Sequence, residues 1–164
     1  MENKFVVVKL NRRDILSYLL FGFAPAILGG VIGIFISSES YSALKLPPLS
    51  APAPVFSAVW AALFVLTGWA SYIVIRATRM MNIKKLDKSV AAYFISLAMN
   101  FIWPLIFFNL NMQLLAAVWL LLYFAVCLYF TVRFFRINKN AGMMALPLLV
   151  WILYCAYINI AVLF

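Results

Sequence analysis

Histidine is absent from this chain, and acidic side chains are few: four carboxylates stand against thirteen lysines and arginines in 164 residues. Without histidine the chain lacks the commonest ligand of metal ions and of haem and the usual general base of enzymes. We therefore expect neither a metal site nor a resident cofactor. The sequence also contains no conventional acid–base or nucleophilic catalytic constellation.

The four carboxylates all lie outside the long apolar segments or at their very edges, at Glu2, Asp14, Glu39 and Asp87. A transporter that is coupled to protons or sodium usually needs an ionisable group at membrane depth. The sequence therefore disfavours ion-coupled transport.

Polar residues are too few for a soluble protein, because 68% of the chain is hydrophobic, 10% is charged and the mean hydropathy is +1.07. The net charge of +9 would suggest nucleic acid in a soluble domain, but here anionic lipid headgroups are the natural counter-charge. We expect a lipid bilayer as partner and no nucleic acid. The two cysteines, Cys127 and Cys155, lie within apolar segments without metal-site spacing, which is typical of buried, inert thiols.

Five apolar segments are each close to the ~20 residues that cross a bilayer as a helix. They lie near 15–36, 55–75, 90–108, 113–132 and 143–163. The sequence thus predicts an all-α membrane protein, with a single domain over 1–164 folded as a bundle of five transmembrane helices. The connection at 37–54 is expected to act as a stiff lid, because its prolines exclude a helix: Pro47, Pro48, Pro52 and Pro54.

The basic residues predict an orientation, since twelve of the thirteen fall before the first helix or in the gaps at 76–89 and 133–139. Only Lys45 breaks the pattern. Lysine and arginine are retained on the cytoplasmic side during insertion. We therefore expect a multi-pass integral membrane protein with its amino terminus in the cytoplasm and its carboxyl terminus outside.

Three of the expected helices carry stripes of aromatic and polar side chains at helical spacing. These stripes are Phe56, Trp60 and Phe64; Tyr93, Ser96, Asn100, Trp103 and Phe107; and Pro147, Trp151, Cys155 and Asn159. An amide in hydrocarbon needs a hydrogen-bond partner, so Asn100 and Asn159 should orient their stripes toward the bundle interior. Such residues hold helices together more often than they bind ligands, and this alternative stays open.

Gly29 and Gly33 in the first segment form a pair of small residues four apart, which lets another backbone approach closely. The pair predicts either a contact within the bundle or the seam of a homodimer.

Taken together, the segments resemble the translocator protein family, which includes the bacterial TspO or tryptophan-rich sensory proteins and the mitochondrial peripheral benzodiazepine receptor. Three motifs in the same order carry the resemblance over nearly the whole chain. They are Tyr41, Leu44, Lys45, Pro47, Pro52, Val55, Phe56, Trp60, Phe64 and Gly68; Asn100, Trp103, Phe107 and Phe108; and Ala141, Gly142, Pro147, Trp151 and Asn159. The chain departs from the family pattern at Leu46, Ala51, Ser96 and Leu148.

The resemblance implies a receptor or sensor that binds protoporphyrin-type tetrapyrroles and other flat hydrophobic molecules inside the bundle. The implied ligand-binding residues are Phe56, Trp60, Phe64, Asn100, Trp103, Phe107, Trp151, Cys155 and Asn159, and the implied lid residues are Tyr41, Lys45, Pro47 and Pro52. Some family members degrade protoporphyrin in light, and by this resemblance Trp60 and Trp151 would be the catalytic pair. Whether this chain is such an enzyme stays open, and an exporter of small hydrophobic molecules is the alternative. The resemblance also suggests a bacterial cell membrane as the location.

The orientation leads to a topological prediction. A reporter fused after Phe164 should be active outside the cytoplasm, and a reporter inserted in the 76–89 gap should be active inside, because the basic gaps are retained there. Reversed reporter activity would refute the orientation, and equal activity on both sides would indicate dual insertion.

Overall fold

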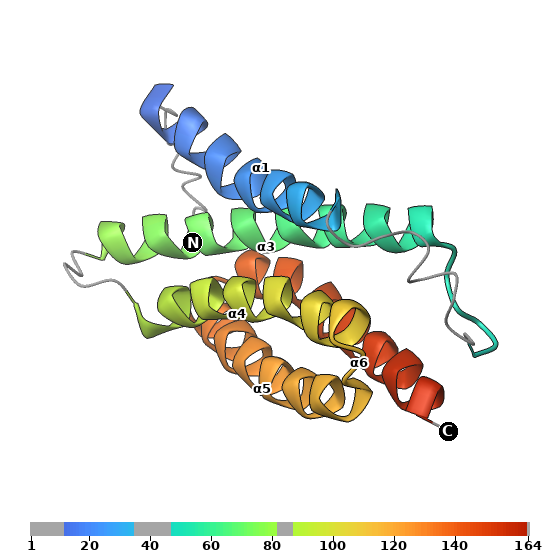
Figure 1. The fold of residues 1–164 in the computed structure, drawn as a ribbon. Coiled ribbons are helices and arrows are strands. Elements are labelled where there is room, and N and C mark those ends of the chain that lie inside the picture. The colour runs from blue at the N-terminus through green and yellow to red at the C-terminus, as the bar shows by residue number, and fades with distance from the viewer. Residues whose placement is uncertain (1–11, 35–46, 82–86, 164) are drawn as a thin grey trace.

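A computed structural model describes residues 12–34, 47–81 and 87–163, and these residues form a bundle of five long helices (Figure 1). The helices are α1 (Arg12–Ile34), α3 (Ala53–Met80), α4 (Lys88–Pro104) with its π-helical continuation η1 (Leu105–Asn109), α5 (Gln113–Ile137) and α6 (Lys139–Leu163). Each of the five is long and apolar enough to cross a membrane, α4 together with η1. The predicted all-α bundle of five transmembrane helices is confirmed.

Local sequence signals explain where the helices begin and end. Pro52 precedes α3, where its missing N–H costs no helical hydrogen bond. Asp87 caps α4 by accepting a hydrogen bond from the Ser89 backbone N–H at 2.8 Å. Asn138 has an extended backbone conformation that ends α5 before α6 begins. Its side chain accepts a hydrogen bond from the backbone N–H of Asn140 at 3.0 Å. Helix α3 extends past its apolar segment to Met80 because long basic side chains near a helix end can reach water while their stems stay in lipid.

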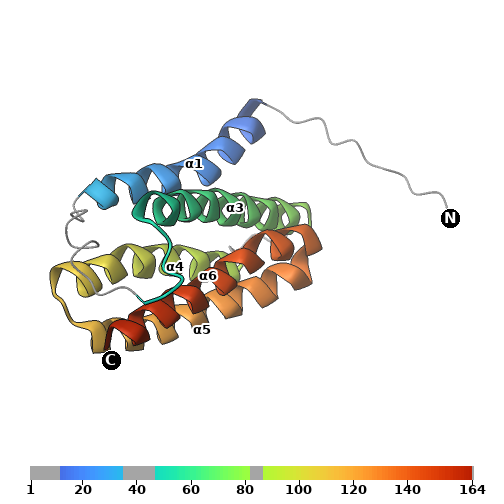
Figure 2. The same ribbon diagram turned by 90° about the vertical axis from the view of Figure 1, so that its right-hand side faces the viewer.

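Helix α1 stands apart from the other four helices. It packs chiefly on α3 and makes a smaller contact with α4. Both ribbon views show α1 layered against α3, with α5 on the far side of the bundle (Figures 1 and 2). Of the five membrane-length helices α1 is the least buried. The remaining helices therefore form the compact body of the protein, and α1 forms an outer layer.

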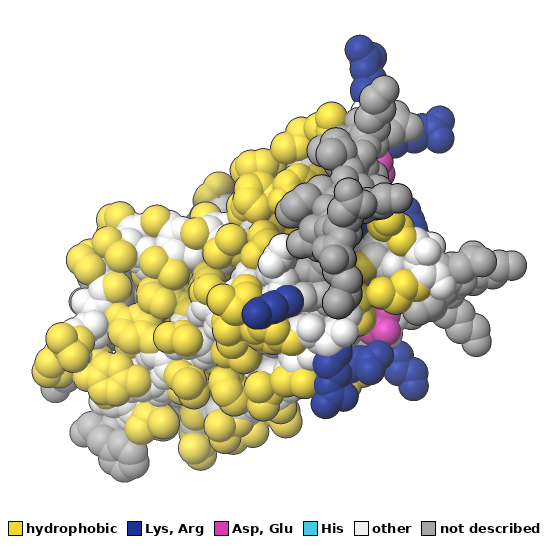
Figure 3. Space-filling view, turned by 180° about the vertical axis from the view of Figure 1, so that it is seen from behind, with side chains coloured by type: hydrophobic (Ala, Val, Ile, Leu, Met, Phe, Trp, Pro, Cys, Tyr) yellow, Lys and Arg dark blue, Asp and Glu magenta, His cyan; other side chains and the backbone are white. Residues whose placement is uncertain are grey.

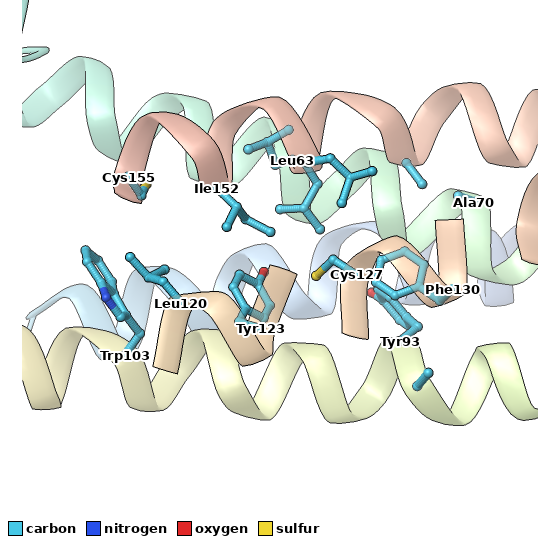
Figure 4. Packing of buried hydrophobic residues seen from close by; sticks show 14 of the residues in the cluster. Leu63, Ala70, Tyr93, Trp103, Leu120, Tyr123, Cys127, Phe130, Ile152 and Cys155 are labelled. Carbon is cyan, nitrogen blue, oxygen red and sulfur yellow. The ribbon is translucent and has the colours of Figure 1, made fainter. Parts of the chain in front are cut away.

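The interior of that body is filled by large aromatic and aliphatic side chains. Tyr123 and Cys127 of α5 and Ile152 of α6 point into the space between the helices (Figure 4). The Asn100 side-chain amide donates a hydrogen bond to the Tyr123 hydroxyl at 3.0 Å, which joins α4 to α5. Such a bond keeps a buried amide from being left unsatisfied in an apolar environment. Asn100 thus meets the expectation of an inward-facing, hydrogen-bonded side chain.

The backbones of α1 and α3 touch where they cross. A Cβ atom added to Gly68 would lie 1.9 Å from the carbonyl oxygen of Phe21 and 3.1 Å from the Cα of Gly22. Beside this contact the Trp69 indole covers Gly22 and stacks on Tyr18, with ring centroids 5.1 Å apart. Glycine is required here because any side chain would push the helices apart. From this contact toward its N-terminal end, α1 separates from α3 (Figures 1 and 2).

One end of the bundle, which we call the basic end, carries the described basic side chains on the helix termini gathered there. They are Arg12, Arg13, Arg76, Arg79, Lys88, Arg133, Arg136 and Lys139 (Figure 3). The opposite end, where residues 47–52 lie, we call the loop end.

Asp87 forms an ion pair with Arg133 at 3.1 Å within the basic end. Burial raises the pKa of the Asp87 carboxyl, but the hydrogen bonds that it accepts from Ser89 and Arg133 outweigh burial and hold its pKa below the ordinary value. A carboxyl with a lowered pKa stabilises the fold at neutral pH, and this contribution is lost as the pH falls through the folded-state pKa.

The helix crossing generates a stability prediction. Gly68→Ala should lower the free energy of unfolding by roughly 1–3 kcal/mol, because the new methyl group would overlap the backbone of α1. Thermal unfolding of the purified protein in detergent measures the change.

The matched control is Gly33→Ala, because a Cβ atom there would meet no other atom within 4 Å. This variant should stay within about 0.5 kcal/mol of the wild type. Equal stability of the two variants would show that the crossing is looser than described.

Candidate functional site

A cavity of about 420 Å³ lies between α1, α3 and α4 toward the loop end. This volume is within the roughly 300–1,000 Å³ that is usual for small-molecule sites. The α1 wall consists of Ala26, Gly29, Gly30, Ile32, Gly33 and Ile34; the α3 wall of Ala53, Phe56, Ser57, Trp60, Ala61 and Phe64; and the third wall of Asn100, Phe101, Trp103, Pro104 and Phe108.

The α1 wall is made largely of residues with little or no side chain. Cβ atoms added to Gly30 or Gly33 would project into open space, whereas one at Gly29 would lie 2.5 Å from the Phe64 ring. Gly29 therefore makes a contact within the bundle, as one of the two predicted roles requires. Gly33 makes no such contact and instead borders the cavity.

The α3 wall is a connected series of aromatic rings. The Trp60 and Phe64 rings are stacked at 5.8 Å, and Phe56 meets Trp60 edge-on at 6.4 Å. Phe64 in turn contacts Phe101 of α4 at 5.5 Å, which joins two walls of the cavity. Such offset and edge-on arrangements are the favoured geometries of aromatic pairs. The wall is therefore a rigid apolar surface.

The third wall depends on Pro104 and the π-helical turn that follows it. Proline has no N–H to donate to the carbonyl of Asn100, so the regular hydrogen-bond pattern is interrupted at this point. The chain continues with wider bonding, and the backbone N–H of Leu110 donates to the carbonyl of Leu105 at 2.9 Å. Turns of this type are frequent at functional sites. This one carries Phe108, which lines the cavity.

The structure divides the nine expected ligand-binding residues into two groups. Five of them line the cavity: Phe56, Trp60, Phe64, Asn100 and Trp103. The other four lie outside its lining: Phe107, Trp151, Cys155 and Asn159. The lining residues come from α1, α3, α4 and η1, and Trp151 of α6 contacts two of them, Phe56 and Trp60.

Trp151 lies directly behind the α3 wall. Its ring meets Trp60 edge-on at a centroid distance of 6.4 Å and an interplanar angle of 87°, and it contacts Phe56 at 5.4 Å. Only Trp60 of the expected catalytic pair therefore borders the cavity. The two indoles are nonetheless in contact, which allows them to act together.

The inward stripe of α6 differs from the one expected. Cys155 and Asn159 are buried, but Pro147 is exposed, and Leu148 and Ile152 occupy the interior. A row of residues four apart drifts around a helix of 3.6 residues per turn, so it cannot stay on one face for three steps. The Asn159 amide is fully buried, and within the described part of the chain it has no hydrogen-bond partner.

Residues 47–51 are fastened to α6 by two tyrosines. The Tyr154 hydroxyl accepts a hydrogen bond from the Ala51 backbone N–H at 2.7 Å and donates one to the Leu49 carbonyl at 3.1 Å. The Tyr157 hydroxyl donates to the Pro48 carbonyl at 2.8 Å. Of the expected lid residues, Pro47 and Pro52 belong to this region, whereas Tyr41 and Lys45 lie outside the described residues.

Several site residues were not identified from the sequence. Phe101, Pro104 and Phe108 line the cavity at steps of three and four, one position along from the row through Asn100 and Trp103. Tyr154 follows Trp151 by three residues, and the two rings are 4.8 Å apart. Helical spacing from a known stripe was the available signal for each of them.

The chemistry open to this cavity is that of aromatic contact. Its lining residues carry no charged side chain, and their polar groups are those of Ser57, Asn100 and the indole N–H groups of Trp60 and Trp103. No group of three potential metal ligands occurs in the part of the chain that the structure describes. The arrangement can hold a flat apolar molecule by stacking and can offer few hydrogen bonds.

Comparison with known proteins shows the family to which this chain belongs. The family model of the TspO/MBR family matches residues 21–164. The chain is 30% identical to the human translocator protein over 146 residues, which cover 87% of this chain and 85% of that protein. It is 27% identical to the tryptophan-rich protein TspO of Archaeoglobus fulgidus over 153 residues, covering 91% and 92%, and 26% identical to protein CrtK of Rhodobacter capsulatus over 154 residues, covering 88% and 89%. The chain therefore belongs to the TspO/MBR family of multi-pass membrane proteins.

Proposed function

We propose that the loop-end cavity binds a flat hydrophobic ligand of the protoporphyrin type, so that the protein acts as a receptor or sensor for such molecules. The observation that carries this proposal is the pairing of an aromatic wall on α3 with a glycine-rich wall on α1. A planar molecule can lie against the Trp60 ring while the backbone of α1 at Gly30 and Gly33 leaves room on its other face. The family resemblance supplies the tetrapyrrole class.

The uncharged lining fits a ligand that is held by its ring system. A metal-free porphyrin needs no axial ligand, and the chain has no histidine to provide one. Asn100 is the polar side chain best placed to orient the ligand, since its amide is fixed by the bond to Tyr123. Fixed polar groups of this kind give an apolar pocket its specificity.

The segment that ends at Pro52 serves in this proposal as a lid. Its described part is held by Tyr154 and Tyr157 on α6, the helix that also carries Trp151. A closed lid chiefly lengthens the residence of a bound molecule. The α6 tyrosines would then set how firmly the lid is closed.

We further propose that a bound porphyrin can be degraded in light through Trp60 and Trp151. One electron would leave the Trp60 indole, which is oxidised, and enter the excited macrocycle, which is reduced. Trp151 would return an electron to Trp60 across their edge-on contact of 6.4 Å. Dissolved dioxygen would take up the electron from the reduced macrocycle and be consumed in its breakdown, and an external thiol reductant would return one electron to the oxidised Trp151.

The binding proposal predicts that filling the cavity weakens protoporphyrin binding. Gly30→Phe should raise the Kd for protoporphyrin by about one to two orders of magnitude, because overpacking costs roughly 1–3 kcal/mol. A Cβ at this position meets no protein atom within 4 Å, so the new ring can occupy the cavity without disturbing the helices. Tryptophan quenching during titration in darkness measures the affinity.

The matched control is Ile27→Phe, which adds an aromatic ring to the exposed face of α1 outside the cavity lining. Its affinity should equal that of the wild type. If Gly30→Phe binds as tightly as Ile27→Phe, the ligand does not occupy this cavity.

The photochemical proposal predicts that affinity and breakdown respond differently to loss of the indoles. Trp60→Phe keeps a ring in the cavity, so the Kd should rise by less than about tenfold, in line with ~0.5–1.5 kcal/mol for an aromatic pair. Trp151→Phe should leave the Kd unchanged, because Trp151 does not line the cavity. Both variants should lose most of the light-dependent loss of protoporphyrin absorbance.

The double variant should be no worse than the more damaged single variant if both indoles act in one step. Trp119→Phe removes an indole that donates a hydrogen bond to the Met99 carbonyl and does not line the cavity, and this variant should degrade protoporphyrin at the wild-type rate. Breakdown that persists undiminished in the double variant excludes this chemistry and leaves the binding function alone.

A further inference from the structure

A second cavity, of about 450 Å³, lies in the wedge between α1 and α3 at the basic end. It is lined by Ile15, Tyr18, Leu19, Tyr72, Ile73, Arg76, Ala77, Met80 and Asn138. The wedge is on the opposite side of the Gly22–Gly68 crossing from the porphyrin cavity. Its existence follows from the same divergence of the two helices.

The lining of this wedge changes from polar to apolar with depth. Arg76 lies about one helical turn before the end of α3, and Asn138 lies at the junction of α5 and α6. Both are therefore at the level where a bilayer meets water. Leu19 and Ile73 lie further along their helices toward the middle of the bundle. The cavity thus matches a molecule with a polar head at the surface and an apolar chain below it.

The charges around Arg76 favour an anionic head. Its guanidinium is 4.0 Å from the Asp14 carboxylate, which is too long for a hydrogen bond, and Asp14 also accepts a hydrogen bond from the Tyr72 hydroxyl at 3.2 Å. Arginine has five N–H donors in a planar fork that suits phosphate oxygens. Among the described residues of the basic end, eight basic side chains stand against Asp14 and Asp87. The local field is therefore positive.

We propose that this wedge binds one anionic phospholipid, with its phosphate at Arg76 and Asn138 and an acyl chain along Leu19 and Ile73. A free phosphate or other small anion would fill only the polar end of the cavity and leave its apolar part unfilled, so the lipid is the better match for the whole cavity. The site is separate from the porphyrin cavity and does not depend on the function proposed for it.

The test is native mass spectrometry of the full chain in a non-ionic detergent, with phosphatidylglycerol or phosphatidylcholine of the same acyl chains added. One phosphatidylglycerol should be retained in preference to phosphatidylcholine. Arg76→Gln should weaken that retention about tenfold, as loss of a charge-assisted hydrogen bond implies. Arg79→Gln removes the same charge from the same helix outside the cavity and should retain the lipid like the wild type.

Two further measurements separate a lipid site from a general attraction of charges. Ala77→Phe fills the wedge while keeping every charge, and it should lose the bound lipid even if Arg76→Gln fails to fold. Added inorganic phosphate should not displace phosphatidylglycerol. Equal retention of the two lipids, equal losses in Arg76→Gln and Arg79→Gln, unchanged retention in Ala77→Phe, or displacement by inorganic phosphate would each overturn the proposal.

Discussion

The contact between the backbones of α1 and α3 at Gly22 and Gly68 is the constraint on which the rest of the structure depends. In lipid there is little hydrophobic gain from bringing two apolar helices together, so association relies on close packing and on polar contacts. Gly68 supplies the close packing, because a Cβ there would overlap the carbonyl of Phe21. This contact holds α1 against α3 near the middle of α1, Gly29 packs on the Phe64 ring toward the loop end, and both cavities are lined by these same two helices.

The body of α3, α4, α5 and α6 is held together differently. Polar side chains within it form bonds between helices, such as Asn100 with Tyr123 and the Trp119 indole with the Met99 carbonyl. Both bonds join α4 to α5, and Leu63 of α3 packs with the large side chains that fill the space between these helices (Figure 4). The proposed binding site thus combines a firm wall on one side with a lightly packed helix on the other. This combination suits a pocket that admits flat molecules of somewhat different size.

Much of this architecture could be predicted from the sequence, because lipid imposes simple rules. Five apolar runs of membrane length fixed the number of helices, and steps of three and four identified the buried row through Tyr93, Asn100 and Trp103. Depth within the bundle could not be predicted in the same way. A stripe shows that a side chain faces inward, but not whether it meets a cavity or another helix, which is why Phe107 and Asn159 were grouped with Trp60. The sequence also did not predict the π-helical turn or the α1 wall of the cavity. Residues with little or no side chain, which make up most of the α1 wall, give no hydrophobic signal.

The contact between Gly22 and Gly68 is also a point about which α1 can tilt. Because α1 and α3 line both cavities, a tilt of α1 about this contact that widens one cavity narrows the other. A molecule bound in the cavity at the loop end and a molecule bound in the cavity at the basic end would therefore displace opposite ends of α1.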